Sequence, residues 1–95
     1  MPHAYIVGHI RVKDPQQWAE YRSRVPATFE AWNAELVFRG RQGPALAGAS
    51  VYPEVVVTRF PDMAAIEGWF NSPAYQALIP IREQAADVVL LTYEA

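Results

Sequence analysis

The chain has 95 residues, of which 52% are hydrophobic and 19% charged, with a net charge of −2 at pH 7. This composition predicts a single globular domain over residues 1–95 and excludes a disordered chain. The acidic balance argues against a partner such as nucleic acid or an anionic membrane. Because cysteine is absent, disulfide scaffolds, zinc fingers and thiol chemistry are excluded. No apolar run resembles a signal peptide or reaches the roughly 18 residues of a membrane span, so we expect a cytoplasmic protein.

The first third of the chain predicts a strand followed by a helix. Residues 3–12 alternate in a period of two, which indicates a strand. One face carries Ala4, Ile6, Gly8, Ile10 and Val12, and the other carries Tyr5, Val7, His9 and Arg11. Asp14 is then the expected N-cap of a helix, with Pro15 in its first position and Gln17 completing a capping box. The helical stripe that follows consists of Trp18, Tyr21, Val25, Phe29 and Trp32.

Two residues are expected to shape the end of that helix. Pro26 lies inside the stripe and should kink or restart the helix, because proline removes a backbone hydrogen bond. Asn33 is the expected end of the helix. A short second strand follows over Glu35 to Arg39, and Gly40 to Gly48 form a loop, as its three glycines and one proline indicate.

The second half repeats the order of strand, helix and strand. Val55 to Phe60 is rich in β-branched residues and predicts a third strand. Asp62 is the expected cap of a second helix, and Ser72 the cap of a further short one with Pro73 at its first position. Pro80 should break or redirect that helix before the last strand, Val88 to Tyr93. The order strand–helix–strand–strand–helix–strand favours a ferredoxin-like α+β sandwich: a four-stranded antiparallel sheet with both helices on one face.

Two helices cover only one face of such a sheet, yet the other face is also apolar. The third strand contains three consecutive valines from Val55, and the fourth runs Val88-Val89-Leu90-Leu91. Tyr5 and Val7 add to the second face of the first strand. An apolar sheet face of several hundred Å² is usually an interaction surface. We therefore expect a homodimer with the two sheets packed face to face, burying on the order of 2,000 Å² or more in total.

The chain resembles a family of short bacterial proteins, the domain of unknown function 1330, over essentially its full length. The residues that carry the resemblance are Tyr5-Ile6-Val7, Asp14-Pro15, Tyr21-Arg22 to Val25-Pro26, Phe38-Arg39-Gly40, Phe60-Pro61 and Trp69 through Arg82. Ser72-Pro73-Ala74-Tyr75-Gln76 is the most specific segment. The resemblance implies the dimeric α+β barrel superfamily, which includes cofactor-free oxygenases, lactone isomerases and haem-binding enzymes. It implies no particular reaction for this chain.

His9 and Arg39 are the candidate catalytic residues. Simple alternation places His9 and Arg11 on the second face of the first strand. In the same way it places Arg39 on the face of Val37, and Arg59 on the face of Val55 and Val57. If these faces meet in a dimer, a histidine and several arginines share an apolar space. A small carboxylate would then supply the partner that buried arginines need. In the simpler interpretation His9 is structural, and Arg39 and Arg59 pair with Glu35, Glu54 or Glu94 at the sheet rim.

The candidate ligand-binding residues are Tyr21, Arg59, Trp69 and Tyr75. For the tyrosines and tryptophans we favour the simpler interpretation that they belong to the hydrophobic core, although a tyrosine hydroxyl can reach a cleft between helix and sheet. For Arg82 we favour a surface salt bridge with Asp87 or another acid.

No metal or cofactor is expected, since one chain cannot bring His3 and His9 to a single ion when they lie about 20 Å apart on a strand. A basic aromatic surface for RNA is also lacking. Two functional hypotheses remain. In the first, a homodimeric barrel binds a small organic molecule, with cofactor-free conversion as the stronger form of the hypothesis. In the alternative, the protein is a non-catalytic dimeric structural or interaction module. Whether it is an enzyme stays open.

Overall fold

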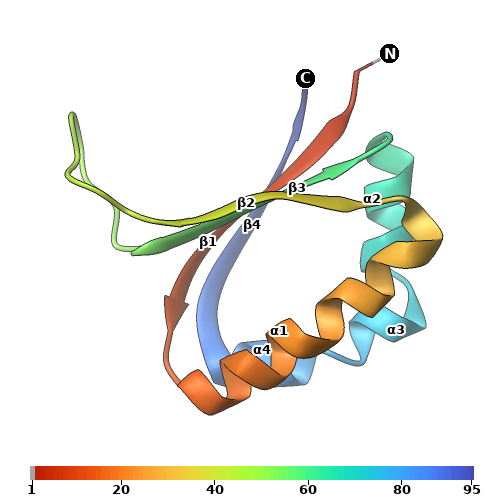
Figure 1. Cartoon of the computed structure of the whole chain (residues 1–95), viewed down its shortest axis with the longest axis horizontal. Helices are drawn as coiled ribbons and strands as arrows, with labels where there is room; N and C mark the ends of the chain where they lie inside the picture. The colour runs from red at the N-terminus through yellow and green to blue at the C-terminus, as the bar shows by residue number, and fades with distance from the viewer. Residues whose placement is uncertain (1) are drawn as a thin grey trace.

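A four-stranded antiparallel sheet forms one layer of the molecule and the helices form the other (Figure 1). The computed structural model describes residues 2–95. The strands are β1 (Ala4–Val12), β2 (Glu35–Arg41), β3 (Glu54–Phe60) and β4 (Ala86–Glu94). The helices are α1 (Pro15–Phe29), the 3₁₀ helix η1 (Glu30–Trp32), α2 (Met63–Phe70), α3 (Pro73–Gln76) and α4 (Ile79–Ala85). The strand order β2-β3-β1-β4 confirms the predicted ferredoxin-like α+β fold.

The caps of the helices follow from the sequence, with one exception. Asp14 accepts hydrogen bonds from the backbone of Gln16 and Gln17, and Asp62 and Ser72 cap α2 and α3 as expected. The predicted capping box of α1 does not form. The Gln17 side chain donates instead to Gln84, and the Asp14 amide donates to the carbonyl of Ala85 at the end of α4. Contacts between distant segments therefore replace the local pattern.

Helix α1 continues through Pro26 to Phe29 and does not restart there. The short η1 extends the segment to Asn33, whose φ of 54° is left-handed. Asparagine tolerates this conformation better than most residues and commonly ends helices in it. The chain therefore reverses where the sequence predicted, and β2 starts two residues later.

A β-bulge in β2 changes which side of the sheet its side chains face. Leu36 lies opposite Thr58, but Arg39 lies opposite Val56, with the irregularity between Leu36 and Phe38. Opposite residues share a face, and Val56 packs against the core under the helices. The expectation from alternation that Arg39 shares the face of His9 and Arg59 is therefore wrong, because one extra residue reverses the parity of the strand.

The core lies between the helices and the inner face of the sheet. Ile6 and Ile10 of β1 are buried there, as the alternation of that strand predicted. Phe60 and Tyr75 are fully buried. Trp32 packs directly on α2 at Gly68, where even a methyl group would lie 2.3 Å from the indole ring. The end of the η1 segment is thus tied to the second helical crossover.

No helix of residues 2–95 covers the outer face of the sheet (Figure 1). Val7 lies at its centre, opposite Val57 on one side and Leu91 on the other. Phe38, opposite Val57, is 51% exposed, and Leu91 is 42% exposed. The apolar second face that the sequence predicted is therefore present.

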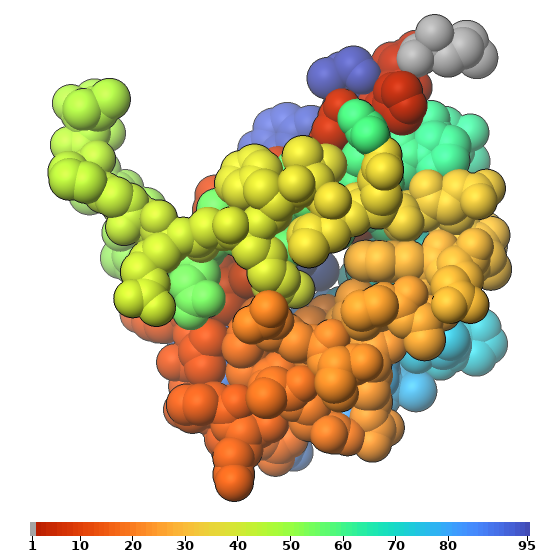
Figure 2. All heavy atoms as spheres, in the orientation of Figure 1, coloured from red at the N-terminus to blue at the C-terminus, as the bar shows by residue number. Residues whose placement is uncertain are grey.

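Residues 42–53 connect β2 to β3 and project from the body of the molecule (Figure 2). Leu46 in this segment is fully exposed. At the opposite end of the sheet the chain termini meet, because His3 and Ala95 exchange two backbone hydrogen bonds of 2.9 and 3.0 Å.

Candidate functional site

A cavity of about 460 Å³ lies between α1 and the inner face of the sheet. In Figure 2 the molecule is hollowed between α1 (orange) and β2 (yellow). Its floor is formed by Val56, Val88 and Leu90 of the sheet, and its sides by aromatic residues that include Trp18 and Trp69. The volume lies in the range of about 300–1,000 Å³ that is usual for small-molecule sites.

Aromatic packing holds one wall of the cavity rigidly. The Trp69 and Tyr75 ring centroids are 4.1 Å apart, and Phe29 and Phe60 lie within 5.5 Å of Trp69. The indole N–H of Trp69 donates to Thr28 Oγ1 over 2.9 Å, and Thr28 in turn donates to the Val25 carbonyl. Each polar atom of the pair has a partner, so the wall is preorganised.

A chain of three polar side chains ends at the cavity. Arg82 Nη1 donates to the Tyr75 hydroxyl over 2.8 Å, and the Tyr75 and Tyr21 hydroxyls lie 2.8 Å apart. Tyr21 comes from α1, Tyr75 from α3 and Arg82 from α4. Burial raises the pKa of Tyr21 above its usual value, and the neighbouring Tyr75 raises it further. The Tyr21 hydroxyl therefore stays protonated at neutral pH and acts as a hydrogen-bonding group, not as a base.

Two arginines lie at the mouth of the cavity, Arg22 from α1 and Arg39 from β2. Among residues 2–95 neither forms an ion pair or a side-chain hydrogen bond, although Glu30 also lines the cavity. Partial burial lowers the pKa of Arg39, and the positive charge of Arg22 lowers it further. The mouth therefore holds two cations whose charges are not compensated by a bonded carboxylate.

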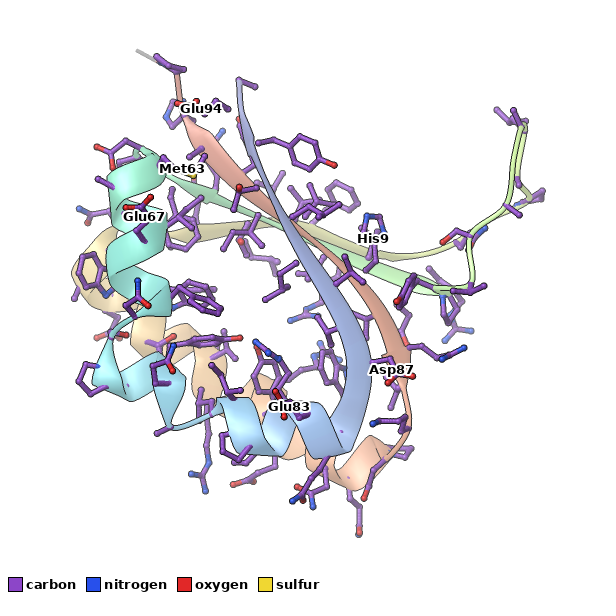
Figure 3. All side chains as sticks on the ribbon, turned by 180° about the vertical axis from the view of Figure 1, so that it is seen from behind. His9, Met63, Glu67, Glu83, Asp87 and Glu94 are labelled. Atoms are coloured by element: carbon purple, nitrogen blue, oxygen red, sulfur yellow. The ribbon has the colours of Figure 1, made fainter. Side chains whose placement is uncertain are left out.

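The structure brings together some of the predicted site residues and separates others. Tyr21, Trp69, Tyr75 and Arg39 line or bound the cavity. His9 lies on the outer face of the sheet, away from the cavity (Figure 3), and its cross-strand neighbours are Val55 and Val89. Its ring is 6.3 Å from that of Tyr52, in a smaller hollow of about 280 Å³. His9 and Arg39 thus cannot act on one molecule within a single chain.

Arg59 forms the ion pair with Glu35 that the simpler interpretation predicted, on the exposed outer face. This pairing raises the pKa of Arg59. Arg59 faces away from the cavity and is not available to a ligand there.

The prediction of a salt bridge from Arg82 to Asp87 is wrong. Asp87 pairs with Arg11 on the neighbouring strand over 2.8 Å, and the hydrogen bond from Arg11 lowers the pKa of Asp87. Arg82 points instead to Tyr75, seven residues earlier in the chain. The turn between α3 and α4 brings the two side chains together. The contact could not be predicted from the spacing of residues within one helix.

Arg22 lines the cavity but was not among the predicted site residues. It lies four residues after Trp18 and three before Val25. That spacing places Arg22 beside the buried stripe of α1. A charged residue next to a buried stripe could therefore have indicated a binding site.

No cluster of three or more His, Asp or Glu within residues 2–95 could hold a metal ion. In the same range no helix is long and apolar enough to cross a membrane.

The family model "Domain of unknown function (DUF1330)" matches residues 3–95. The chain belongs to this family. The comparison with curated proteins found no match.

Three solved structures illustrate the fold. RPA0582, a protein of unknown function from Rhodopseudomonas palustris, has a TM-score of 0.83 at 19% identity over 99% of this chain and 82% of its own. SnoaB, a cofactor-independent oxygenase from Streptomyces nogalater, has a TM-score of 0.72 at 12% identity over 100% and 94%. A dimeric ferredoxin-like protein of unknown function from Thermobifida fusca has a TM-score of 0.64 at 17% identity over 99% and 92%. At these identities the similarity shows the fold alone.

Proposed function

We propose that this DUF1330 protein binds a small organic carboxylate in the cavity between α1 and the sheet. The observation that carries the proposal is an apolar cavity whose mouth holds Arg22 and Arg39 without an ion-pair partner in the described residues. Partial burial disfavours the charge of Arg39, and an anion that pairs with its guanidinium in a bidentate geometry would offset this cost.

The apolar interior defines the rest of the ligand. Trp18, Trp69 and the floor residues Val56 and Leu90 offer aromatic and aliphatic surface, with few polar atoms. A hydrophobic body inside and an anionic group at the mouth would match this division. An aromatic or alicyclic carboxylate has this shape.

Cofactor-free conversion of the ligand is the stronger form of the proposal. It is supported by the fold that the chain has in common with SnoaB. Of the two candidate catalytic residues, Arg39 is placed to hold a ligand, and His9 is on the other face of the sheet. We therefore propose Arg39 as a ligand-binding residue and do not propose a joint site with His9.

The test is a calorimetric and thermal-shift screen of benzoate and its substituted forms against the native protein, Arg39→Ala and Arg22→Ala. We expect a bound carboxylate to raise the melting temperature of the native protein. In either variant the affinity for the carboxylate, measured by calorimetry, should be about tenfold lower, and the melting temperature should rise less. Arg24→Ala, on an exposed part of α1 outside the cavity, is the matched control. Equal binding by all four proteins, or by none, would contradict the proposal.

We also propose that the outer sheet face forms a homodimer. Support comes from the apolar surface around Val7, Val57, Phe38 and Leu91, which no helix covers. Burial of each ~400 Å² of such surface contributes on the order of 10 kcal/mol before association costs. Sedimentation at micromolar concentration is expected to give a particle of twice the 10.7 kDa chain mass. A stable single-chain particle would reject the dimer.

A further inference from the structure

The burial of its members favours one direction for the hydrogen-bond chain Arg82–Tyr75–Tyr21. Tyr75 is 0% exposed, and its hydroxyl oxygen accepts a hydrogen bond from Arg82 Nη1 over 2.8 Å. The only other side-chain hydrogen-bond partner of this hydroxyl among residues 2–95 is the Tyr21 hydroxyl, also 2.8 Å away. The distance alone allows either tyrosine hydroxyl to donate, and both residues line the cavity. An unpaired buried donor costs about 1–3 kcal/mol, so the hydroxyl with better access to the cavity and solvent is the one better left to donate outward. Tyr21 is 8% exposed and Tyr75 0%, which favours donation from Tyr75 to Tyr21.

This direction leaves the proton of the Tyr21 hydroxyl without an acceptor in the protein. Tyr21 is 8% exposed and lines the cavity. When its oxygen accepts from Tyr75, its O–H group is free to donate a hydrogen bond into the cavity. Because the positive charge of Arg82 stands at the start of the chain, each hydroxyl along it is polarised toward donation.

The donor and the cations occupy different depths. Tyr21 is buried, whereas Arg22 and Arg39 are exposed at the mouth. Burying an anion next to a desolvated hydroxyl costs more than leaving it at a solvated cationic rim. A carboxylate therefore belongs at the mouth, and a neutral acceptor oxygen belongs at Tyr21.

We propose that the ligand is an oxo-carboxylate: a molecule with a carboxylate for Arg22 and Arg39 and a carbonyl oxygen that accepts the hydrogen bond of Tyr21. Tyr75 and Arg82 are positioning residues that act on the ligand through Tyr21. This inference rests on the proposed carboxylate site and specifies the second polar group that the cavity recognises.

The probes are 3- and 4-acetylbenzoate, compared with 3- and 4-isopropylbenzoate. The two members of each pair have nearly the same shape, but only the acetyl group contains an acceptor oxygen. We measure the affinities by calorimetry for the native protein, Tyr21→Phe, Tyr75→Phe and Arg82→Met, with Tyr93→Phe on the outer face as the control. The readout is the ratio of the acetyl to the isopropyl affinity, which a general loss of packing does not change.

In the native protein and in Tyr93→Phe, we expect at least one acetylbenzoate to bind about tenfold more tightly than its isopropyl partner, the effect of one additional hydrogen bond. In Tyr21→Phe the ratio should fall to about one while isopropylbenzoate binding persists. Tyr75→Phe and Arg82→Met should reduce the ratio to intermediate values, and Arg82→Lys, which restores a cationic donor, should recover part of it.

The outcomes separate the two proposals. Equal binding of both members of each pair by the native protein, or a ratio that Tyr21→Phe leaves unchanged, would overturn the oxo-carboxylate inference and leave the carboxylate site standing. Failure of all four probes to bind any of the proteins would overturn both.

Discussion

The two faces of the sheet are both apolar, but they satisfy their charges differently. On the outer face the charged groups pair with each other across strands, Arg11 with Asp87 and Arg59 with Glu35. On the inner side, Arg82 of α4 bonds to the neutral hydroxyl of Tyr75, and Arg39 of β2 forms no ion pair or side-chain hydrogen bond among residues 2–95. The outer face has paired charges but leaves apolar side chains exposed, whereas the inner face has its apolar side chains packed but leaves Arg39 without a bonded carboxylate. Another protein surface would cover the exposed apolar side chains, and a small anion would pair with Arg39.

The largest expected effect concerns the centre of the outer face. Val57→Glu places a carboxylate opposite Val7 and Phe38. If the two outer faces pack together, the buried charge should weaken dimerisation by at least about 4 kcal/mol, because it is desolvated without a partner. Sedimentation velocity measures the change, with Ala27→Glu on the exposed side of α1 as the control. An unchanged particle mass in Val57→Glu would show that the outer face is not the interface.

A smaller effect is expected where Trp32 packs on α2 at Gly68. Gly68→Ala forces a methyl group against Trp32, 2.3 Å from the ring, and should destabilise the fold by about 1–3 kcal/mol through overpacking. Gly43→Ala, in the projecting segment where no atom lies within 4 Å, is the matched control and should be nearly neutral. Urea unfolding compares the two, and equal midpoints would contradict the tight contact.

Substitution of one arginine on each face sharpens the comparison further. Arg39→Ala removes a cation that partial burial disfavours, and Arg59→Ala removes one from an exposed ion pair. Each should alter the free energy of unfolding by less than about 1 kcal/mol, because Arg39 has no ion pair to lose and the exposed pair of Arg59 contributes little. Only Arg39→Ala should weaken carboxylate binding, about tenfold. Loss of binding in Arg59→Ala at unchanged stability would contradict the assignment of faces.

The smallest expected effect is a pH dependence from Tyr21. Its pKa is raised above 10.0 in the folded protein, mainly by burial. The stability that this group contributes is fully present below pH 10.0 and is lost as pH rises above it, because the unfolded chain then releases a proton that the folded chain retains. The slope is at most about 1.4 kcal/mol per pH unit for one proton. Tyr21→Phe should remove this part of the alkaline slope, as denaturation between pH 9 and pH 11 would measure; parallel slopes would refute it.

Much of the fold could be predicted from local patterns, because those patterns act within a few residues. Such cases are the alternation in β1, the Asp14 and Ser72 caps and the end of the helical segment at Asn33. The outer apolar face followed from the same reasoning, because the topology covers only one side of the sheet.

The candidate site could be predicted only in part. The bulge near Val37 has no glycine or proline to announce it, and it moved Arg39 from one face to the other. The contact of Arg82 with Tyr75 depends on how α3 turns into α4. Both errors arise where the position of a polar side chain is set by a local irregularity or by tertiary packing. The burial of aromatic residues such as Trp69 could be predicted because it follows from helical spacing.

The pairing of His3 with Ala95 has a practical consequence for engineering the chain. Since the two ends already belong to one ladder, a short glycine-rich link could join them without crossing the sheet. New ends could then be opened near Leu46, where the backbone is remote from the core and insertions are tolerated. Such a circular permutant would keep the strand order β2-β3-β1-β4 while making β3 the first strand to emerge during synthesis.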